Sequence, residues 1–411
     1  MNLLKLKKRK EILAWSLYDF ANQPFSTIIV TFIYSTFFIK VIADNEEVGT
    51  VLWANSIAIT AIIVSVLSPL LGVIADASGT RKSFLFFFTL MSSICTALLY
   101  FPNEGDVFMA LLLFIIANIC FEIATVFYNS YLPDLSDSKN SGRISGFAWG
   151  LGFFGGLTAL FLFYILFPDL DFFSVKKINV LVGAWFIFFS IPAFIFLKAE
   201  KKTFAKKQII LPFSAIKETF RNVLEYSSIA QFLVARLFFN DGLVTIFALG
   251  GIYAVGTLGF TFDEVMILAI VLNLSAGIGS FLFGYMEDRI GVKLVINISL
   301  IVLIFSTLLA FIAPYFSVKK EIFWIAGIFI GLMVGPNQSC SRSLMSQLTP
   351  KDKKNEFFGF FALTGKFTSF LGPFLFGLIT SIYNQQMALW VVILFFVIGL
   401  ILFNKIKFND K

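Results

Sequence analysis

Histidine is absent from this sequence of 411 residues, and cysteine occurs only three times. Without an imidazole, a group that exchanges protons near neutral pH has to be a carboxylate or another side chain with a shifted pKa. Cys95, Cys120 and Cys340 all lie in apolar runs, and none belongs to a CxxC pair. Neither a metal site nor a disulfide framework is therefore predicted. An enzyme within the membrane would need a metal cluster or a nucleophile beside a base, so we expect no enzyme activity and no cofactor.

Charged residues and long polar segments are also scarce. Only 14% of the residues are charged, and the longest polar break covers residues 198–226. A receptor or scaffold would bring a large soluble domain or long loops. The chain lacks the P-loop pattern, which argues against transport powered directly by ATP hydrolysis. A cleavable signal peptide is not predicted, because the apolar run after "MNLLKLKKRK" is too long and no small-residue cleavage site closes it. We expect the first span to remain as a signal anchor.

Apolar residues fill most of the chain. They make up 58% of it, and the mean hydropathy is +0.88. A soluble protein of this composition could not cover its surface with polar groups, so the fold class is an all-α membrane protein. A helix needs about 20 mainly apolar residues to cross the hydrocarbon. Twelve such transmembrane helices are predicted, at residues 12–39, 51–75, 83–101, 107–131, 144–167, 179–197, 227–256, 265–286, 294–314, 322–344, 357–382 and 387–403.

The distribution of Lys and Arg orients these spans. Most of the 32 Lys and Arg lie at the two ends, in the 198–226 break and in alternate loops. The opposite loops hold Lys40, Lys176, Lys177, Lys319 and Lys320. The positive-inside rule therefore predicts that both termini are cytoplasmic. The net charge of +7 arises largely from loops that face the membrane surface, so no nucleic-acid partner is predicted. We expect a monomeric multi-pass protein of a bacterial inner (plasma) membrane, whose partners are the lipid bilayer and a small-molecule solute.

Two sequence blocks recur in the second half of the chain. "GVIADASGTRK" follows the second span and "GYMEDRIGVK" follows the eighth, at a constant offset of 212 residues. "GFAWGLG" begins the fifth span and "GFFALTG" the eleventh, at an offset of 213. Internal duplication about an axis along the membrane normal is one architecture of transporters. We therefore predict a six-helix half at 1–200, a cytoplasmic linker at 201–226 and a second six-helix half at 227–411.

The repeated loop resembles the signature loop of the major facilitator superfamily. That resemblance implies two pseudo-symmetric halves and transport by alternating access. The glycines would let helix ends approach closely, and Asp76 would meet the positive N-terminus of a neighbouring helix. Arg81 or Lys82 would pair with a carboxylate across the halves. The alternative is an ordinary cytoplasmic turn with anchoring charges. The residues assigned to a conformational gate are Gly72, Asp76, Gly79, Arg81, Lys82, Gly284, Asp288, Gly291 and Arg342.

A narrower resemblance covers nearly the whole chain. "WSLYDFAN", "FYNSYLPDLS", "SGRISGFAWGLGFFGG" and "GPNQSCSRSLMSQLTP" occur in order. They resemble successive blocks of the family that contains the fungal vacuolar amino-acid exporter involved in autophagy, together with bacterial relatives. This resemblance implies secondary transport of a small solute, with amino acids as one candidate class. A cation-coupled sugar symporter is the alternative, since such proteins also carry aspartates on the first span.

Six ionisable side chains lie within predicted spans: Asp19, Glu122, Arg236, Asp241, Arg342 and Lys366. Each costs about 2.5–3.5 kcal/mol on insertion scales, so we expect them to face the bundle interior. The superfamily resemblance places spans one, four, seven and ten around a central cavity, and five of the six residues are on those spans. Arg342 lies near the cytoplasmic end of its span, which favours the gate over the substrate.

The polar residues at membrane depth predict a binding site for substrate or coupling ion. Its residues are Asp19, Asn22, Asn118, Glu122, Asn240, Asp241 and Lys366. A carboxylate beside an amide suits a sodium ion, a titrating carboxylate that carries a coupling proton, or a substrate ammonium. Lys366 would meet a substrate carboxylate or Asp241. Structural alternatives stay open: Asp19 caps a helix broken near Pro24 or only pairs with a basic residue, and Glu122 forms a buried bridge to an arginine such as Arg143.

Overall fold

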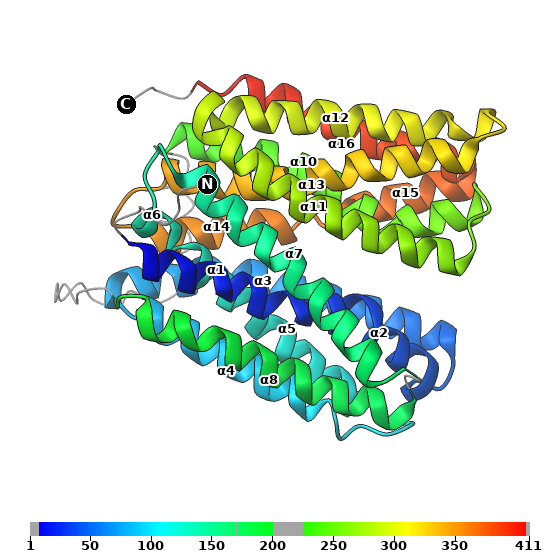
Figure 1. Ribbon diagram of the computed structural model, residues 1–411, viewed down its shortest axis with the longest axis horizontal. Coiled ribbons are helices and arrows are strands. Elements are labelled where there is room, and N and C mark those ends of the chain that lie inside the picture. The colour runs from blue at the N-terminus through cyan, green and yellow to red at the C-terminus, as the bar shows by residue number, and fades with distance from the viewer. Residues whose placement is uncertain (1–7, 169–170, 200–224, 408–411) are drawn as a thin grey trace. The chain divides into compact units, whose positions relative to one another are not determined.

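Helices account for nearly all of the chain that the structure describes. The computed structural model describes residues 8–168, 171–199 and 225–407 (Figure 1). The predicted linker, 201–226, therefore lies almost entirely outside the described residues. Eleven described helical segments are long and apolar enough to cross a membrane. The remaining predicted span, the third, corresponds to α4 (Arg81–Leu98), a shorter helix of 18 residues. The all-α membrane fold is confirmed.

The described residues divide into two compact units. Unit 1 contains residues 1–135, 151–216 and 350–362, and unit 2 contains 136–150, 217–349 and 363–411. Each unit therefore includes a short segment from the other half of the sequence. Those two segments contain the beginnings of the fifth and the eleventh span, where the second repeated block lies.

Unit 1 is built on packed helices that run along a common direction (Figure 1). The pairs α4–α5, α1–α8, α4–α8 and α3–α5 make its main contacts. Its elements are α1 (Arg9–Pro24), η2 (Phe25–Phe32), α2 (Tyr34–Phe37), η3 (Phe38–Ile42), α3 (Glu46–Ser78), α4, α5 (Val107–Asn129), α6 (Leu132–Leu135), α8 (Phe172–Phe196), the later part of α7 (Ser141–Leu166) and the beginning of α14 (Lys354–Lys366). Aromatic stacking of Trp53 on Phe114, with ring centroids 4.0 Å apart, lies in its apolar core.

Unit 2 has the same kind of construction. Its main contacts join α11 with α13, α10 with α16 and α12 with α13. Its elements are α10 (Ser227–Gly256), α11 (Phe262–Ile290), α12 (Val292–Ile312), η4 (Ala313–Tyr315), α13 (Lys319–Leu348), α15 (Leu371–Ile382), α16 (Gln385–Asn404), the end of α14 (Lys354–Lys366) and the beginning of α7.

The first span changes from an α-helix to a π-helix at a proline. α1 ends at Pro24 and η2 continues with π-type hydrogen bonds. Proline has no N–H, so the carbonyl group of Phe20, four residues earlier, loses its helical donor. The indole Nε1 of Trp185 on α8 donates to that oxygen at 3.3 Å. A neighbouring helix thus satisfies the freed backbone group, as a membrane interior requires.

Many large apolar side chains of both units are exposed. Examples are Phe108, Phe161, Phe188, Ile267 and Phe374, each more than half accessible. A soluble protein rarely shows this much contiguous apolar surface, whereas a lipid-facing surface requires it.

Candidate functional site: two repeated helix-end contacts and buried polar residues

The glycines that end the repeated loops have backbone conformations that other residues rarely adopt. Gly79 follows α3 with φ of 66°, and Gly291 follows α11 with φ of 89°. Glycine reaches such positive φ values without a steric penalty from a Cβ atom. Both positions share a positive φ, although ψ is 26° at Gly79 and 148° at Gly291, and each glycine lets the chain turn into the next long helix.

Asp76 binds the N-terminus of another helix, as the sequence analysis expected. Its Oδ1 accepts the backbone N–H of Asn355 at 3.1 Å, and its Oδ2 accepts that of Glu356 at 2.8 Å. These residues lie at the beginning of α14, where backbone N–H groups lack helical partners and the helix dipole is positive. A Cβ atom on Gly72 would lie 2.4 Å from the carbonyl oxygen of Asn355, so only glycine permits this approach.

Unit 2 contains the equivalent contact. Oδ1 of Asp288 accepts the backbone N–H groups of Gly142 at 3.0 Å and Arg143 at 3.4 Å, at the beginning of α7. A Cβ atom on Gly284 would lie 2.8 Å from the carbonyl oxygen of Gly142. Gly142 and Arg143 precede Asn355 and Glu356 by 213 residues, the offset of the second repeat. The two repeated sequence blocks therefore contact each other in the same way in each unit.

The charges around the two contacts differ. In unit 1, Arg81 donates to Asp134 at 2.7 Å and to the carbonyl oxygen of Ser130 at 2.8 Å. Lys354 forms an ion pair with the same Asp134 at 2.5 Å. Arg81 forms an ion pair with Asp134 of its own half, one short turn beyond α5, and Lys82 donates to the carbonyl oxygen of Leu197 at 2.6 Å. The expectation that Arg81 or Lys82 pairs with a carboxylate of the other half stays a prediction.

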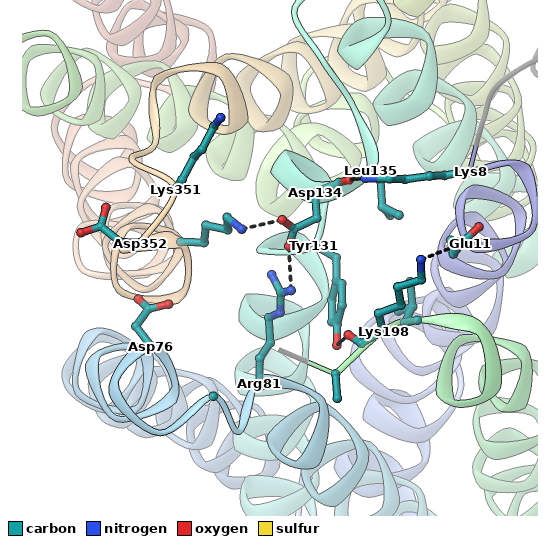
Figure 2. Close-up of a pocket in the computed structure, with 14 residues that line it drawn as sticks. Lys8, Glu11, Asp76, Arg81, Tyr131, Asp134, Leu135, Lys198, Lys351 and Asp352 are labelled. Carbon is teal, nitrogen blue, oxygen red and sulfur yellow. Dashed lines mark hydrogen bonds and ion pairs between the residues drawn. The ribbon is translucent and has the colours of Figure 1, made fainter. Parts of the chain in front are cut away.

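A pocket of about 490 Å³ opens beside this ion-pair network. Figure 2 shows Arg81 pointing toward Asp134, with Tyr131 alongside and the Lys198–Glu11 pair at the other end of the pocket. Basic and acidic side chains line it in similar numbers and most of them are paired. The pocket contains Asp76, Gly79 and Arg81 of the predicted gate and none of the residues predicted to bind substrate.

In unit 2, an ion pair and a buried carboxylate take the place of the Asp134 cluster. Arg143 pairs with Asp288 at 2.7 Å. Buried Glu287 accepts a hydrogen bond from Ser343 and another from Gln347. Arg143, which was considered as the partner of Glu122, therefore binds Asp288.

Arg342, the last residue assigned to the gate, is almost fully buried on α13. Its Nε donates to the hydroxyl of Ser145 at 2.9 Å, and its Nη2 donates to the carbonyl oxygen of the same residue at 2.8 Å. Ser145 belongs to the beginning of α7, directly after the residues that Asp288 holds. Arg342 therefore contacts the same helix end as Asp288, as its assignment expected.

Asp19 and Asn22 are buried on one side of α1, and Asn22 lies two residues before the break at Pro24. The backbone position of Gly152 on α7 lies against Asp19, where a Cβ atom would approach its side chain at 3.4 Å. The adjacent Tyr18 bonds to Thr89 at 2.6 Å. Asp19 therefore faces a neighbouring helix and not lipid. On α5, Asn118 is buried and Glu122 is half-buried.

The remaining predicted residues belong to α10 and to the end of α14, both in unit 2. Asn240 and Asp241 are buried side by side. The amide Nδ2 of Asn240 donates to the carbonyl oxygen of Gly365 at 3.2 Å, and Thr368 donates to Asp241 at 3.0 Å. Lys366 ends α14. The suggested pairing of Lys366 with Asp241 is not observed, because the Asp241 carboxylate bonds to Thr368 instead.

Sequence reasoning missed several residues of these networks. Asp134, Lys354, Asn355 and Thr368 were not assigned, although "FYNSYLPDLS" and "NEFFGFFALTGK" surround them. The offset of 213 could have identified Asn355, since it places that residue opposite Gly142. Nothing local indicated Thr368, because its role depends on a partner more than a hundred residues away.

The comparisons with known proteins agree with this architecture. Residues 46–410 match the family described as "Vacuole effluxer Atg22 like". The chain is 28% identical to the Uncharacterized MFS-type transporter YxiO of Bacillus subtilis, over 95% of this chain and 93% of that protein. It is 24% identical to Autophagy-related protein 22 of Kluyveromyces lactis, over 79% of this chain and 72% of that protein.

Similar solved structures share the fold at low sequence identity. The human organic anion transporter MFSD10 (TETRAN) gives a TM-score of 0.78 at 12% identity, over 97% of this chain and 100% of that one. The proton:xylose symporter XylE gives 0.73 at 13% identity, over 95% and 94% of the two chains. The family match spans most of the chain and the fold is that of the major facilitator superfamily. The chain therefore belongs to the Atg22-like vacuole effluxer family and is a multi-pass membrane transporter of a small solute.

Proposed function

We propose that this protein moves amino acids across the membrane by alternating access. The observation that carries the proposal is the repeated contact of a loop carboxylate with a helix N-terminus, Asp76 with α14 and Asp288 with α7. Each contact joins segments from the two halves of the sequence. A transporter whose halves rock against each other has to break and remake such contacts in every cycle.

The chemistry of these contacts suits a reversible latch. A carboxylate that accepts backbone N–H groups at a helix N-terminus is stabilised by about 0.3–1 kcal/mol through the helix dipole alone. Hydrogen bonds to a charged group add about 1.5–3 kcal/mol. These energies are large enough to favour one conformation and small enough for substrate binding to shift the equilibrium. Arg81, Lys354 and Arg342 would tune the same equilibrium from their neighbouring sites.

The buried polar residues supply the groups that an amino acid requires. Asp19, with Asn22 beside it, would bind the substrate ammonium or the coupling cation. Lys366 would bind the substrate carboxylate. Asn118, Glu122, Asn240 and Asp241 would complete the predicted set. In support, the described members are buried or half-buried, as expected of groups that face the protein interior.

The membrane placement belongs to the same proposal. The positive-inside pattern puts both termini and the two latches on the cytoplasmic side of a bacterial inner membrane. A monomer suffices, because each latch is formed within one chain. The coupling ion would be a proton or sodium.

A cation-coupled sugar symporter is the alternative, and a ligand screen distinguishes the two. Purified protein is heated with amino acids, peptides, sugars and nucleosides, with and without sodium. Binding stabilises a protein in proportion to the logarithm of ligand concentration over Kd, so a true ligand raises the Tm in a dose-dependent way. The proposal expects the shift with an amino acid. A shift confined to sugars would contradict it and select the symporter.

A further inference from the structure

The eleventh span is interrupted within the membrane. α14 ends at Lys366 and α15 begins at Leu371, so residues 367–370 form a turn inside a span of 29 residues. Ser369 N–H donates to the carbonyl oxygen of Lys366 at 3.3 Å, a bond across three residues instead of four. Pro373 has no N–H, which removes the helical donor for the carbonyl group of Ser369. Broken helices of this kind are tolerated at membrane depth only where protein or a polar cavity covers them.

Polar side chains from α10 cover this break. Asn240 Nδ2 donates to the carbonyl oxygen of Gly365 at 3.2 Å, and Arg236 donates to the hydroxyl of Thr364 at 3.2 Å. The hydroxyl of Thr368, inside the turn, donates to Oδ1 of Asp241 at 3.0 Å. The turn and the carboxylate are therefore in direct contact.

Asp241 is a buried carboxylate, and few partners stabilise its negative charge. It is 2% exposed, and within the described chain its side chain accepts one hydrogen bond, from Thr368, and forms no ion pair. A lone negative charge in such surroundings is costly, and the group lowers that cost by taking up a proton. Asp241 therefore has a physical reason to change its charge in the transport cycle.

The neighbouring amide is already occupied, which disfavours a metal cation. Oδ1 of Asn240 accepts a hydrogen bond from Gln338 at 3.2 Å, and its Nδ2 donates to the carbonyl oxygen of Gly365. A sodium ion would have to take the amide oxygen from Gln338. Among the described residues no cluster of three or more carboxylate or thiol side chains could hold a metal ion. A proton needs only the carboxylate.

The ionisable groups on the elements near Asp241 lie mostly near the ends of their helices. α15 and α16, which pack against α10, contain none. The others on neighbouring elements are Arg236 and Tyr253 on α10, Lys354, Glu356 and Lys366 on α14, Cys340 and Arg342 near the end of α13, Lys319, Lys320 and Glu321 at its beginning, and Asp263, Glu264, Tyr285, Glu287, Asp288 and Arg289 near the ends of α11. Arg236, one and a half turns before Asp241, and Lys366, two residues before Thr368, favour its ionised form, so the proton would be released as well as bound.

We propose that Asp241 binds and releases the coupled proton, and that its charge controls the turn between α14 and α15 through Thr368. The inference rests on the proposed function and names the ion and its site. Water outside the protein donates the proton to the carboxylate, and the neutral carboxyl returns it to water in the other conformation. A hydrogen bond to a carboxylate is about twice as strong as one to a neutral carboxyl, so protonation loosens the turn. Asp19 is then left for the substrate ammonium.

Infrared difference spectra of the protein in lipid, recorded between high and low pH, test the proton site. We expect a band of a buried protonated carboxyl that disappears in Asp241→Asn. Glu287→Gln is the matched control, because it removes another buried carboxyl of unit 2 and should leave the Asp241 band in place. Persistence of all buried carboxyl bands in Asp241→Asn would overturn the assignment.

Hydrogen–deuterium exchange of residues 366–371 tests the coupled turn. After correction for the intrinsic pH dependence of exchange, wild-type protein should exchange roughly tenfold faster at low pH, the factor expected for losing a charged hydrogen bond. Asp241→Asn and Thr368→Val should exchange fast at every pH, and Thr368→Val should keep the Asp241 band. Hydrogen–deuterium exchange that responds to sodium but not to pH would contradict the assignment of a proton as the coupled ion. Both measurements need no substrate, so they decide this inference even if no amino acid is transported.

Discussion

The backbone N–H of Glu356 donates to the carboxylate of Asp76 at 2.8 Å, which joins the end of α3 to the beginning of α14. These residues are 280 positions apart in the sequence and belong to different halves of it. The Asp288 contact with α7 repeats the arrangement in unit 2. Two copies of one contact imply that the carboxylates act on conformation, because neither lies among the residues predicted to bind substrate.

Asp76→Asn should slow transport while leaving substrate affinity nearly unchanged. The amide can still accept one hydrogen bond, but it loses the charge that favours the helix N-terminus, about 0.3–1 kcal/mol. Transport rates and Kd values measured on the same preparation check this. Asp352→Asn is the control, since Asp352 lines the same pocket in an exposed position. A collapse of affinity with a normal rate would place Asp76 in the binding site.

Gly72→Ala should destabilise the protein and stop transport. Its Cβ atom would lie 2.4 Å from the carbonyl oxygen of Asn355, a backbone atom that cannot move aside cheaply. Overpacking of this kind costs about 1–3 kcal/mol. Gly377→Ala on α15 is the matched control, because no atom lies within 4 Å of its added Cβ. The Tm of the two variants in detergent should differ clearly, and equal Tm values would refute the close approach.

Arg81→Lys should weaken the network of unit 1 although the charge is kept. Arg81 contacts Asp134 and the carbonyl oxygen of Ser130 together, and its guanidinium lies 3.8 Å from the ring centroid of Tyr131. Lysine cannot reproduce the two directed bonds and the stacking. We expect a lower Tm and slower transport, at a cost of about 1–3 kcal/mol. Wild-type values in both assays would show that the positive charge alone suffices.

The sequence predicted the repeated loops well and the long-range partners poorly. Gly72, Gly79 and Asp76 were identified because their chemistry is local and duplicated. Asp134 was missed because its partners, Arg81 and Lys354, come from distant segments. Pairing with Asp241 was one of two roles considered for Lys366, and it is not among the described contacts, in which Thr368 donates to Asp241.

The interruption of the eleventh span was also missed. Residues 357–382 read as one apolar run, and hydropathy does not detect a four-residue turn inside it. Gly365 and Pro373 were the local signals, because glycine weakens a helix and proline removes a backbone donor. The break brings the Thr368 hydroxyl into contact with the Asp241 carboxylate, a contact that the apolar composition of the span does not indicate.

Cysteine labelling tests the proposed orientation in the membrane. The native residues Cys95, Cys120 and Cys340 are buried, so their background labelling should be low. Ser138 and Glu104 are both exposed, in loops predicted to lie on opposite sides of the membrane. A membrane-impermeant thiol reagent should label Glu104→Cys in intact cells and Ser138→Cys only after permeabilisation. The reverse pattern would invert the topology.

The most direct test of the account is gradient-driven amino-acid transport by the purified protein in proteoliposomes, with wild type and Asp19→Asn compared. Asn keeps the shape of the side chain and removes its charge, and removal of a membrane charge should not impair insertion. We predict that wild type accumulates a labelled amino acid against its gradient, and that Asp19→Asn, which lacks the charge that binds the substrate ammonium, loses both accumulation and exchange. Undiminished accumulation by well-inserted Asp19→Asn would contradict the account and reduce Asp19 to a structural residue of α1.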